Sequence, residues 1–235
     1  MTSADHFDGR GSQTLARGVK ILRALQSAPE GLSVADLVRA VGLHRSIVTR
    51  LLTTLEEEHF VERTRTRAYR LGLGLIALGK AVRADLRDLS EEALTALAGL
   101  SGATAVLVLR DGAHAVVVSV VEPLGSDLRL LFRLGSRHPL EQGAEGMAIL
   151  AGNPPREGER PEVTRAREAG YVVSEGEIMP GTWGLAVPVM SADSRSEMSV
   201  GVIAAQALDE AKTFKLVKEV ALSLQARLDW ADELR

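Results

Sequence analysis

The chain has 235 residues, a net charge of −3, no cysteine and an apolar fraction of 46%. That apolar fraction supports a packed core, and the absence of cysteine excludes a disulfide scaffold, a thiolate metal site and a cysteine nucleophile. No apolar run reaches the ~18 residues of a membrane span, and the N-terminal stretch MTSADHFDGRGSQT has no apolar signal region. We therefore expect a cytoplasmic protein without membrane contact, in which residues 1–12 form a disordered tail.

Charge is distributed unevenly along the chain. Residues 1–85 carry 13 basic and nine acidic side chains, a balance of +4, whereas the remaining 150 residues carry 15 basic and 22 acidic ones, a balance of −7. Such asymmetry indicates a basic module joined to an acidic one. The charge of the whole chain gives no hint of a nucleic-acid partner. Whether the basic module binds nucleic acid must therefore be judged from the residue pattern inside it.

The basic module begins with two expected helices. Residues 14–27 have apolar positions at helical spacing, namely Leu15, Val19, Leu22 and Leu25. After a turn, Ser33 precedes Asp36 by three residues, as in a capping box that begins a short helix through Ala40. Gly42 is typical of the end of that helix.

A third expected helix runs from Arg45 to Glu58. Its core side carries Val48, Leu51, Leu52 and Leu55, and its polar positions are Arg45, Ser46, Thr49, Arg50 and Thr53. Two short helices joined by a glycine-containing turn are typical of a DNA-binding helix-turn-helix. The second helix of that motif enters the major groove, where its N-terminal side chains reach the edges of the bases.

The segment FVERTRTRAYRLG follows and has β-forming residues on both sides of a polar turn, which predicts a hairpin. Four arginines lie along it: Arg63, Arg65, Arg67 and Arg70. A basic hairpin after a recognition helix can act as a wing that contacts phosphates or the minor groove. A winged helix that serves protein assembly is the alternative.

The module resembles the IclR family of bacterial transcription regulators. The resemblance rests on Gly42-Leu43, Ser46, Arg50-Leu51-Leu52 and Tyr69-Arg70-Leu71-Gly72. One departure is His59, where the family usually has a glycine, so this position must tolerate a left-handed cap or end the helix differently. The resemblance implies a winged helix-turn-helix domain over residues 1–72, and dimers, or tetramers made of paired dimers, formed through it.

We expect this domain to bind double-stranded operator DNA. Ser46 and Thr49 are the candidates for reading bases, and Arg45 for a base or a phosphate. Arg50, Arg63, Arg65 and Arg67 are the candidates for phosphate contacts, because each neutralised phosphate strengthens salt-sensitive binding. Ser33 completes the set of candidate DNA-contacting residues.

A linker helix is expected next, over residues 73–85, based on the sequence LIALGKAVRADL. Gly72, Gly74 and Gly79 do not have the GxGxxG spacing of a nucleotide-binding loop, and they follow a hairpin. A further helix is expected from Ser90 to Leu100, because Ser-Glu-Glu is typical of an N-cap and an acidic first turn.

The remaining segment, residues 86–235, mixes strands and helices. Strands are expected at 104–110 and 113–121 around the turn Asp111-Gly112, and at 128–132, 185–189 and 198–205. Helices are expected at 142–151, at 163–169 and from Asp209, the last with a core stripe at Phe214, Val217, Ala221, Leu224 and Leu228. This order predicts an α+β domain with an antiparallel sheet flanked by helices.

The resemblance extends to this segment and implies a GAF-like effector domain that binds a small organic acid. Gly143-Ala144-Glu145-Gly146 would open a helix with exposed backbone N–H groups, which favours an anion; the alternative is that these small residues only allow close helix packing. Further pocket residues are implied by aligned position or by proximity: Leu130, Ser174, Trp183, Gly184, Gly201 and Ile203.

Some family members that bind small keto acids have an acid, a cysteine and two serines at the aligned positions. Here these positions hold Ser174, Gly184, Gly201 and Ile203, which are smaller or more apolar. We therefore expect an aromatic or alicyclic acid as effector, in preference to glyoxylate or pyruvate.

Catalytic and metal-binding signals are weak. No two of the five histidines lie three to five residues apart, so we expect no metal site. Ser101 lies in GLSG and not in the GxSxG of a nucleophile elbow. We expect no cofactor and no enzymatic activity; a GAF-like enzyme with an accessory basic domain is the alternative.

Overall fold

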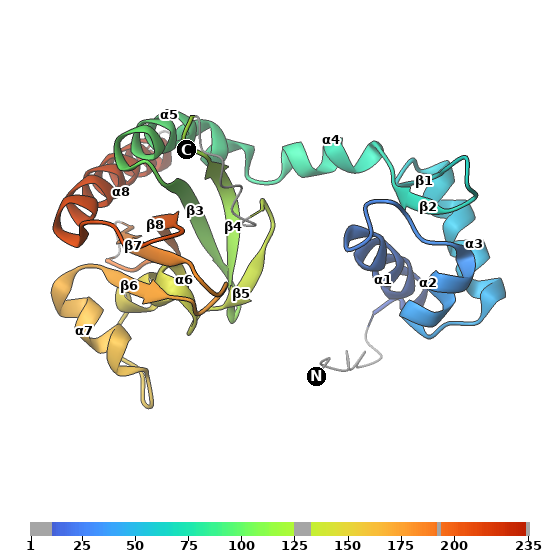
Figure 1. The fold of residues 1–235 in the computed structure, drawn as a ribbon, viewed down its shortest axis with the longest axis horizontal. Coiled ribbons are helices and arrows are strands. Elements are labelled where there is room, and N and C mark those ends of the chain that lie inside the picture. The colour runs from blue at the N-terminus through green and yellow to red at the C-terminus, as the bar shows by residue number, and fades with distance from the viewer. Residues whose placement is uncertain (1–10, 125–132, 192–193, 234–235) are drawn as a thin grey trace. The chain divides into compact units, whose positions relative to one another are not determined.

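The computed structural model describes residues 11–124, 133–191 and 194–233. The chain divides into two compact units, residues 1–82 and residues 83–235 (Figure 1). The division lies within the segment expected as a linker, and each unit has its own hydrophobic core.

The first unit is a winged helix-turn-helix, as the sequence predicts. Its elements are α1 (Gln13–Gln26), α2 (Val34–Val41), α3 (Arg45–Glu57), β1 (Val61–Arg63), β2 (Tyr69–Leu71) and α4 (Gly74–Ala81). The two strands pair antiparallel, with Val61 opposite Leu71. Ile21, Leu37 and Leu52, one from each of the first three helices, are fully buried and hold the unit together.

The buried face of α1 differs from the expected one. Gly18, Ile21 and Leu25 face the core, whereas Leu15 is 69% exposed and Val19 is 39% exposed. The apolar pattern of this helix is wider than its contact with α2 and α3, so hydrophobic spacing identified Leu25 but not Gly18 and Ile21. Ser12, expected in a disordered tail, is the N-cap of α1 and accepts from the Leu15 amide.

The continuous linker helix expected over residues 73–85 is interrupted. The helix α4 ends at Ala81, Val82 is extended, and Arg83 has a left-handed φ of 47° before α5 (Ala84–Ser101) begins. Ser90 is therefore internal to α5 and not an N-cap: its side chain is buried and donates to the carbonyl of Arg87 at 3.2 Å.

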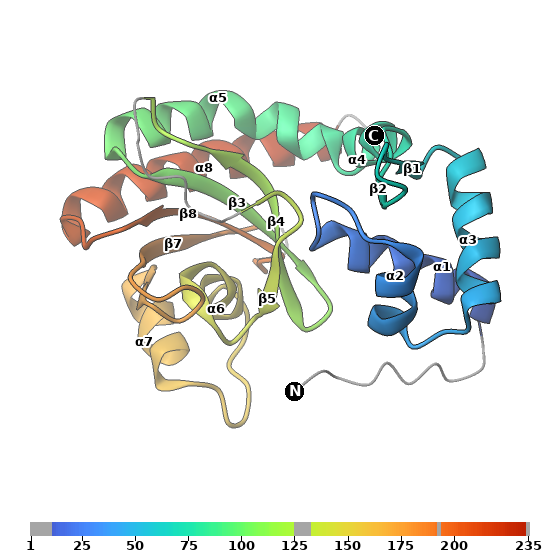
Figure 2. The same cartoon turned by 45° about the vertical axis from the view of Figure 1, so that its right-hand side comes forward.

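The second unit contains a six-stranded antiparallel sheet in the order β5-β4-β3-β8-β7-β6 (Figure 2). Its strands are β3 (Thr104–Asp111), β4 (His114–Val121), β5 (Arg137–Pro139), β6 (Val172–Glu175), β7 (Trp183–Val189) and β8 (Met198–Ala204). The unit is completed by α6 (Gly143–Ala151), α7 (Pro161–Ala169) and α8 (Glu210–Glu233). This architecture confirms the predicted α+β class.

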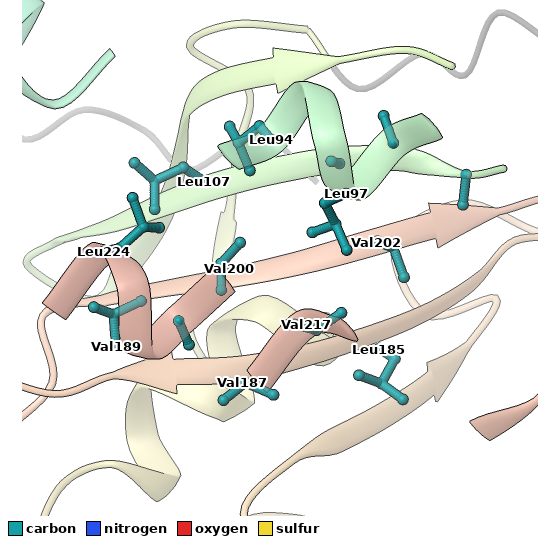
Figure 3. Packing of buried hydrophobic residues seen from close by; sticks show 14 of the residues in the cluster. Leu94, Leu97, Leu107, Leu185, Val187, Val189, Val200, Val202, Val217 and Leu224 are labelled. Atoms are coloured by element: carbon teal, nitrogen blue, oxygen red, sulfur yellow. The ribbon is translucent and has the colours of Figure 1, made fainter. Parts of the chain in front are cut away.

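Alternating side chains build a core on each face of the sheet. Leu185 and Val187 of β7 pack with α5 and α8 on one face, as Figure 3 shows, whereas Ala186 between them faces α6 and α7. The predicted stripe of α8 is confirmed at Val217, which is fully buried. The two helix layers therefore lie on opposite sides of the sheet.

Three details of the sheet differ from the expectation. Asp111 pairs with His114, so the two turn residues are Gly112 and Ala113, one position later than expected. The short edge strands β5 and β6 were not predicted. The expected strand 128–132, which includes Leu130, lies outside the described residues.

Candidate DNA interface and ligand site

The helix α3 separates a core side from a polar side. Val48, Leu51 and Leu52 are buried, while Arg45, Ser46, Thr49 and Arg50 are exposed. The N-cap residue His44 makes no side-chain cap. The exposed N-terminal half of α3 thus offers hydroxyl and guanidinium groups, together with an uncapped first turn that favours phosphate.

Ser33 is engaged in local hydrogen bonds at the start of α2. Its hydroxyl donates to Asp36 Oδ2 at 2.6 Å and accepts from the Asp36 amide at 3.2 Å, which forms the predicted capping box of α2. The Ser33 hydrogen bonds, followed by the Arg39 guanidinium, lower the pKa of the Asp36 carboxyl. Because the single O–H of Ser33 is already donated, the structure leaves it no donor for a phosphate.

The wing presents exposed arginines on a hydrogen-bonded turn. Thr64 accepts from the Ala68 amide at 3.1 Å, and Arg67 takes a left-handed φ of 64°. The Arg63 guanidinium lies 5.8 Å from the centroid of the Tyr69 ring. Arg70 differs, because it pairs with Glu62 across the two strands.

Five arginines of this surface have no acidic partner among the described residues: Arg45, Arg50, Arg63, Arg65 and Arg67. Each is exposed. Five unneutralised guanidinium groups within one unit create the positive field that attracts a polyanion.

His59 and the glycines after the wing have structural roles. His59 adopts a left-handed φ of 60°, one of the two outcomes expected for a non-glycine there. Its carbonyl accepts from the Gly74 amide at 3.0 Å, and a Cβ on Gly74 would lie 2.8 Å from that oxygen. Close backbone approach explains this glycine without a bound nucleotide.

In the second unit, most of the expected ligand-contacting residues lie on the α6 face of the sheet. Ser174, Gly184 and Ile203 occupy paired positions on three neighbouring strands. A Cβ on Gly184 would lie 3.6 Å from both Ala144 Cβ and Ser174 Oγ. Gly201, two residues before Ile203, belongs to the next row on the same face.

Trp183 does not belong to this group. It packs in the cluster formed with α5 and α8, on the opposite face of the sheet. Adjacent residues of a strand point to opposite faces of the sheet. Trp183 therefore does not share a site with Gly184, although the two are neighbours in sequence. Leu130 lies outside the described residues.

The N-terminus of α6 is not exposed, contrary to expectation. All nine residues of this helix are buried, and the Gly143 amide donates to Glu177 Oε2 at 2.9 Å. A Cβ on Gly146 would lie 2.6 Å from the Leu140 carbonyl, so the alternative of close packing applies to this glycine. The helix terminus does hold a carboxylate, but it is one from the chain itself.

Glu145 is the most unusual ionisable group in the described residues. It lies in the first turn of α6 and is only 3% exposed, and burial raises its pKa to about 7. No described residue forms a hydrogen bond with its Oε1 atom. Its Oε2 atom lies 3.5 Å from the position that a Cβ on Gly143 would take. At neutral pH this carboxyl can therefore act as a hydrogen-bond donor or acceptor.

No local sequence pattern identifies Arg160 and Glu177, which meet at this helix terminus. The Arg160 Nη1 and Nη2 atoms donate to Glu177 Oε2 and Oε1 at 3.1 and 3.0 Å. Partial burial raises the pKa of Glu177, but hydrogen bonds from Arg160 and Gly143 outweigh it and hold the pKa below its usual value. Arg160 comes from the N-cap of α7 and Glu177 from the loop between β6 and β7, so only the fold brings them together.

The described ranges contain neither a metal-site cluster nor a membrane span. No three His, Asp or Glu side chains there are grouped so that they could hold a metal ion. No helix in these ranges is both long and apolar enough to cross a bilayer.

Comparisons with known proteins agree with both units. The IclR helix-turn-helix domain matches residues 14–65, and the C-terminal domain of the bacterial transcriptional regulator IclR matches residues 79–160. The HTH-type transcriptional regulator Rv1719 of Mycobacterium tuberculosis is 38% identical over 156 residues, which cover 65% of this chain and 60% of that protein. The chain thus spans about three fifths of the length of this curated relative.

Solved structures match over a larger share of the chain. An IclR transcriptional regulator from Alicyclobacillus acidocaldarius has a TM-score of 0.77 at 25% identity, covering 92% of this chain and 98% of that one. An IclR homologue from Microbacterium hydrocarbonoxydans, solved in complex with 4-hydroxybenzoate, has a TM-score of 0.77 at 20% identity, covering 91% and 98%. The second likeness concerns the fold alone.

Proposed function

Because the chain belongs to the IclR family of bacterial transcriptional regulators, we propose that it binds operator DNA and changes its DNA affinity when its second unit binds a small organic acid. Its relatives are named as transcriptional regulators and not as enzymes, so the alternative of a GAF-like enzyme is not retained. The observation that carries the proposal is the set of five exposed, unpaired arginines around α3 and the wing.

The DNA-binding roles follow the geometry of the first unit. Ser46 and Thr49 lie in the first turns of α3 and read base edges, with Arg45 beside them contacting a base or a phosphate. Arg50 and the wing arginines neutralise phosphates on either side of the groove. Thr49 donates its hydroxyl to the Arg45 carbonyl at 3.0 Å, so it meets a base edge as an acceptor.

Fluorescence anisotropy with the DNA upstream of the gene tests this role. We expect the intact protein to bind one duplex within that region at least ~10³-fold more tightly than a scrambled duplex. Affinity should fall steeply as salt increases, because condensed counterions are released on binding. Equal affinity for both duplexes would refute operator recognition.

We propose that the ligand lies between α6 and the sheet, in contact with Ser174, Gly184 and Ile203. Two of these residues support this placement. Gly184 adds no side-chain volume, and Ile203 offers an apolar wall that is only 2% exposed. Such surroundings favour an aromatic or alicyclic ring over a small polar keto acid. Calorimetry with 4-hydroxybenzoate, cyclohexanecarboxylate, pyruvate and glyoxylate tests the ligand class; tight binding of pyruvate alone would refute it.

We also propose that the protein is a homodimer joined through its first unit. Large apolar side chains are exposed there, among them Leu15 on α1 and Ile76 on α4, which is 54% exposed. Monomeric proteins rarely leave such residues in contiguous patches, so a second copy is expected to cover them. Sedimentation analysis of Ile76→Glu should show a monomer, and an unchanged dimer would refute the assignment of this surface.

A further inference from the structure

The N-terminus of α6 is closed by a carboxylate that belongs to the protein itself. Glu177 accepts from the Gly143 amide at 2.9 Å and receives two hydrogen bonds from Arg160. Arg160 is anchored in turn by the Glu141 carbonyl, to which its Nη1 atom donates at 2.7 Å. A two-pronged guanidinium combined with a backbone N–H is the arrangement that proteins use to recognise a carboxylate.

A second carboxyl, in the first turn of the same helix, has one oxygen without a hydrogen-bond partner among the described residues. Glu145 lies two residues further along α6, is 3% exposed, and has an Oε1 atom without a hydrogen bond to any described residue. Its Oε2 atom lies near the Cα of Gly143. A buried polar atom without a partner is unfavourable, because its lost hydration is not replaced, so such atoms call for an explanation. A ligand that enters beside Gly143 would supply the missing partner.

Solvent can reach the carboxylate of Glu177. The side chain of Glu177 is 25% exposed and that of Arg160 is 35% exposed. Glu177 belongs to the loop between β6 and β7, in which Ile178 and Met179 pack against the α6 cluster. Ile178 also covers Gly143, because a Cβ there would lie 2.9 Å from Ile178 Cγ1. Movement of this one loop would expose the Gly143 amide and the Arg160 guanidinium together.

We propose that Arg160 and the Gly143 amide are the subsite for the effector's carboxylate, and that Glu177 is an internal competitor which the effector displaces. Glu145 then forms a hydrogen bond with a polar group elsewhere on the ligand. This inference rests on the proposed function, since it specifies how the same domain recognises an organic acid. Exchange of one carboxylate for another conserves the charge beside Arg160 and releases the loop that carries Glu177.

Thermal unfolding of Glu177→Ala, measured at increasing acetate concentrations, tests the subsite without knowledge of the effector. The variant removes the carboxylate from the Gly143 amide and from both Nη atoms of Arg160, whose Nε atom keeps Glu162 at 3.3 Å. Acetate should therefore raise its Tm progressively, as expected for a ligand that binds only the folded state. Wild type should not respond, nor should Glu168→Ala, which removes an exposed carboxylate from α7. The double variant Glu177→Ala with Arg160→Met should lose the response. Equal effects of acetate on wild type and Glu177→Ala would overturn the proposal.

Calorimetry with 4-hydroxybenzoate and Glu177→Gln keeps the proposal testable if Glu177→Ala fails to fold. Glutamine retains an acceptor for the Gly143 amide but binds Arg160 more weakly, so the affinity for the acid should rise about tenfold when the competitor holds the subsite nine tenths of the time. Lower or unchanged affinity would contradict the competitor role, as would the absence of binding to Glu177→Gln.

These results separate the subsite from the proposed function. If acetate stabilises Glu177→Ala through Arg160 but no acid alters operator binding, the subsite is supported and the sensing role fails. If an acid alters operator binding equally in wild type and Arg160→Met, the sensing role stands and the subsite is overturned.

Discussion

Replacement of Arg50 by alanine should weaken operator binding without loss of stability. Arg50 is exposed on α3 and has no acidic partner among the described residues. Alanine is at least as good a helix former, so the fold of the first unit should be retained. In a dimer the substitution removes two phosphate contacts, one from each copy.

The size of the effect follows from counterion release. Each phosphate contact contributes about 0.9 to the slope of log affinity against log salt, so the slope should decrease in magnitude by about 1.8. At about 0.1 M salt, two such contacts correspond to an affinity loss of about 60-fold. Anisotropy titrations over a salt series would measure both quantities.

Arg39→Ala is the matched control for this prediction. Arg39 is an exposed arginine of the same unit, but it pairs with Asp36 and lies on α2. Its removal changes the net charge equally and should alter the salt slope by much less. If Arg50→Ala and Arg39→Ala behave alike, only overall charge matters and the placement of α3 in the groove is wrong.

Four further substitutions test other parts of the structure. Ser33→Ala removes the capping box of α2 and should cost about 1 kcal/mol in unfolding free energy, with operator sequence preference unchanged; a shift in preference would show direct contact with DNA. The pKa of Glu145 is about 7 in the folded protein, against 4.5 for the free group. This group's contribution to stability therefore falls by about 3 kcal/mol as pH rises through that window. Urea unfolding of Glu145→Gln should show a flatter pH dependence than wild type, and an unchanged slope would contradict the burial argument. Gly184→Ala should fold normally but bind the acid more weakly, because its Cβ meets neighbours at 3.6 Å, whereas Gly201→Ala should be destabilised by a Cβ 2.8 Å from the Leu185 carbonyl; equal unfolding midpoints for the two variants would refute this distinction.

The elements that were predictable from sequence are those fixed by local signals. Ser33 and Asp36 mark the start of α2, and Gly42 ends it with a left-handed φ of 66°. The valine-rich strands β3 and β4 and the long stripe of α8 are equally local patterns. The break between α4 and α5 has no such signal, because neither Val82 nor Arg83 is a typical helix-breaking residue.

Short edge strands were missed for a related reason. β5 has three residues and ends in proline, and β6 has four, so neither is long enough for a clear alternation of apolar and polar residues. Their pairing depends on the neighbouring strands already present in the sheet.

The candidate ligand site was only partly predictable. The small residues at the start of α6 indicated a terminus suited to an anion, but not that Glu177, 34 positions later, would occupy it. A shift of one residue also separates Trp183 from Gly184 by the full thickness of the sheet. Local patterns thus located the helix, whereas the groups around it come from loops that only the tertiary fold brings together.

The effect of an aromatic acid on operator affinity tests the central claim most directly. The operator duplex would be titrated with the intact protein in the absence and in the presence of saturating 4-hydroxybenzoate or a related acid that calorimetry shows to bind. We predict that the acid changes the operator Kd by the same factor by which the duplex changes the Kd of the acid. An operator Kd that stays constant at saturating acid would contradict the claim that this chain is a ligand-responsive regulator.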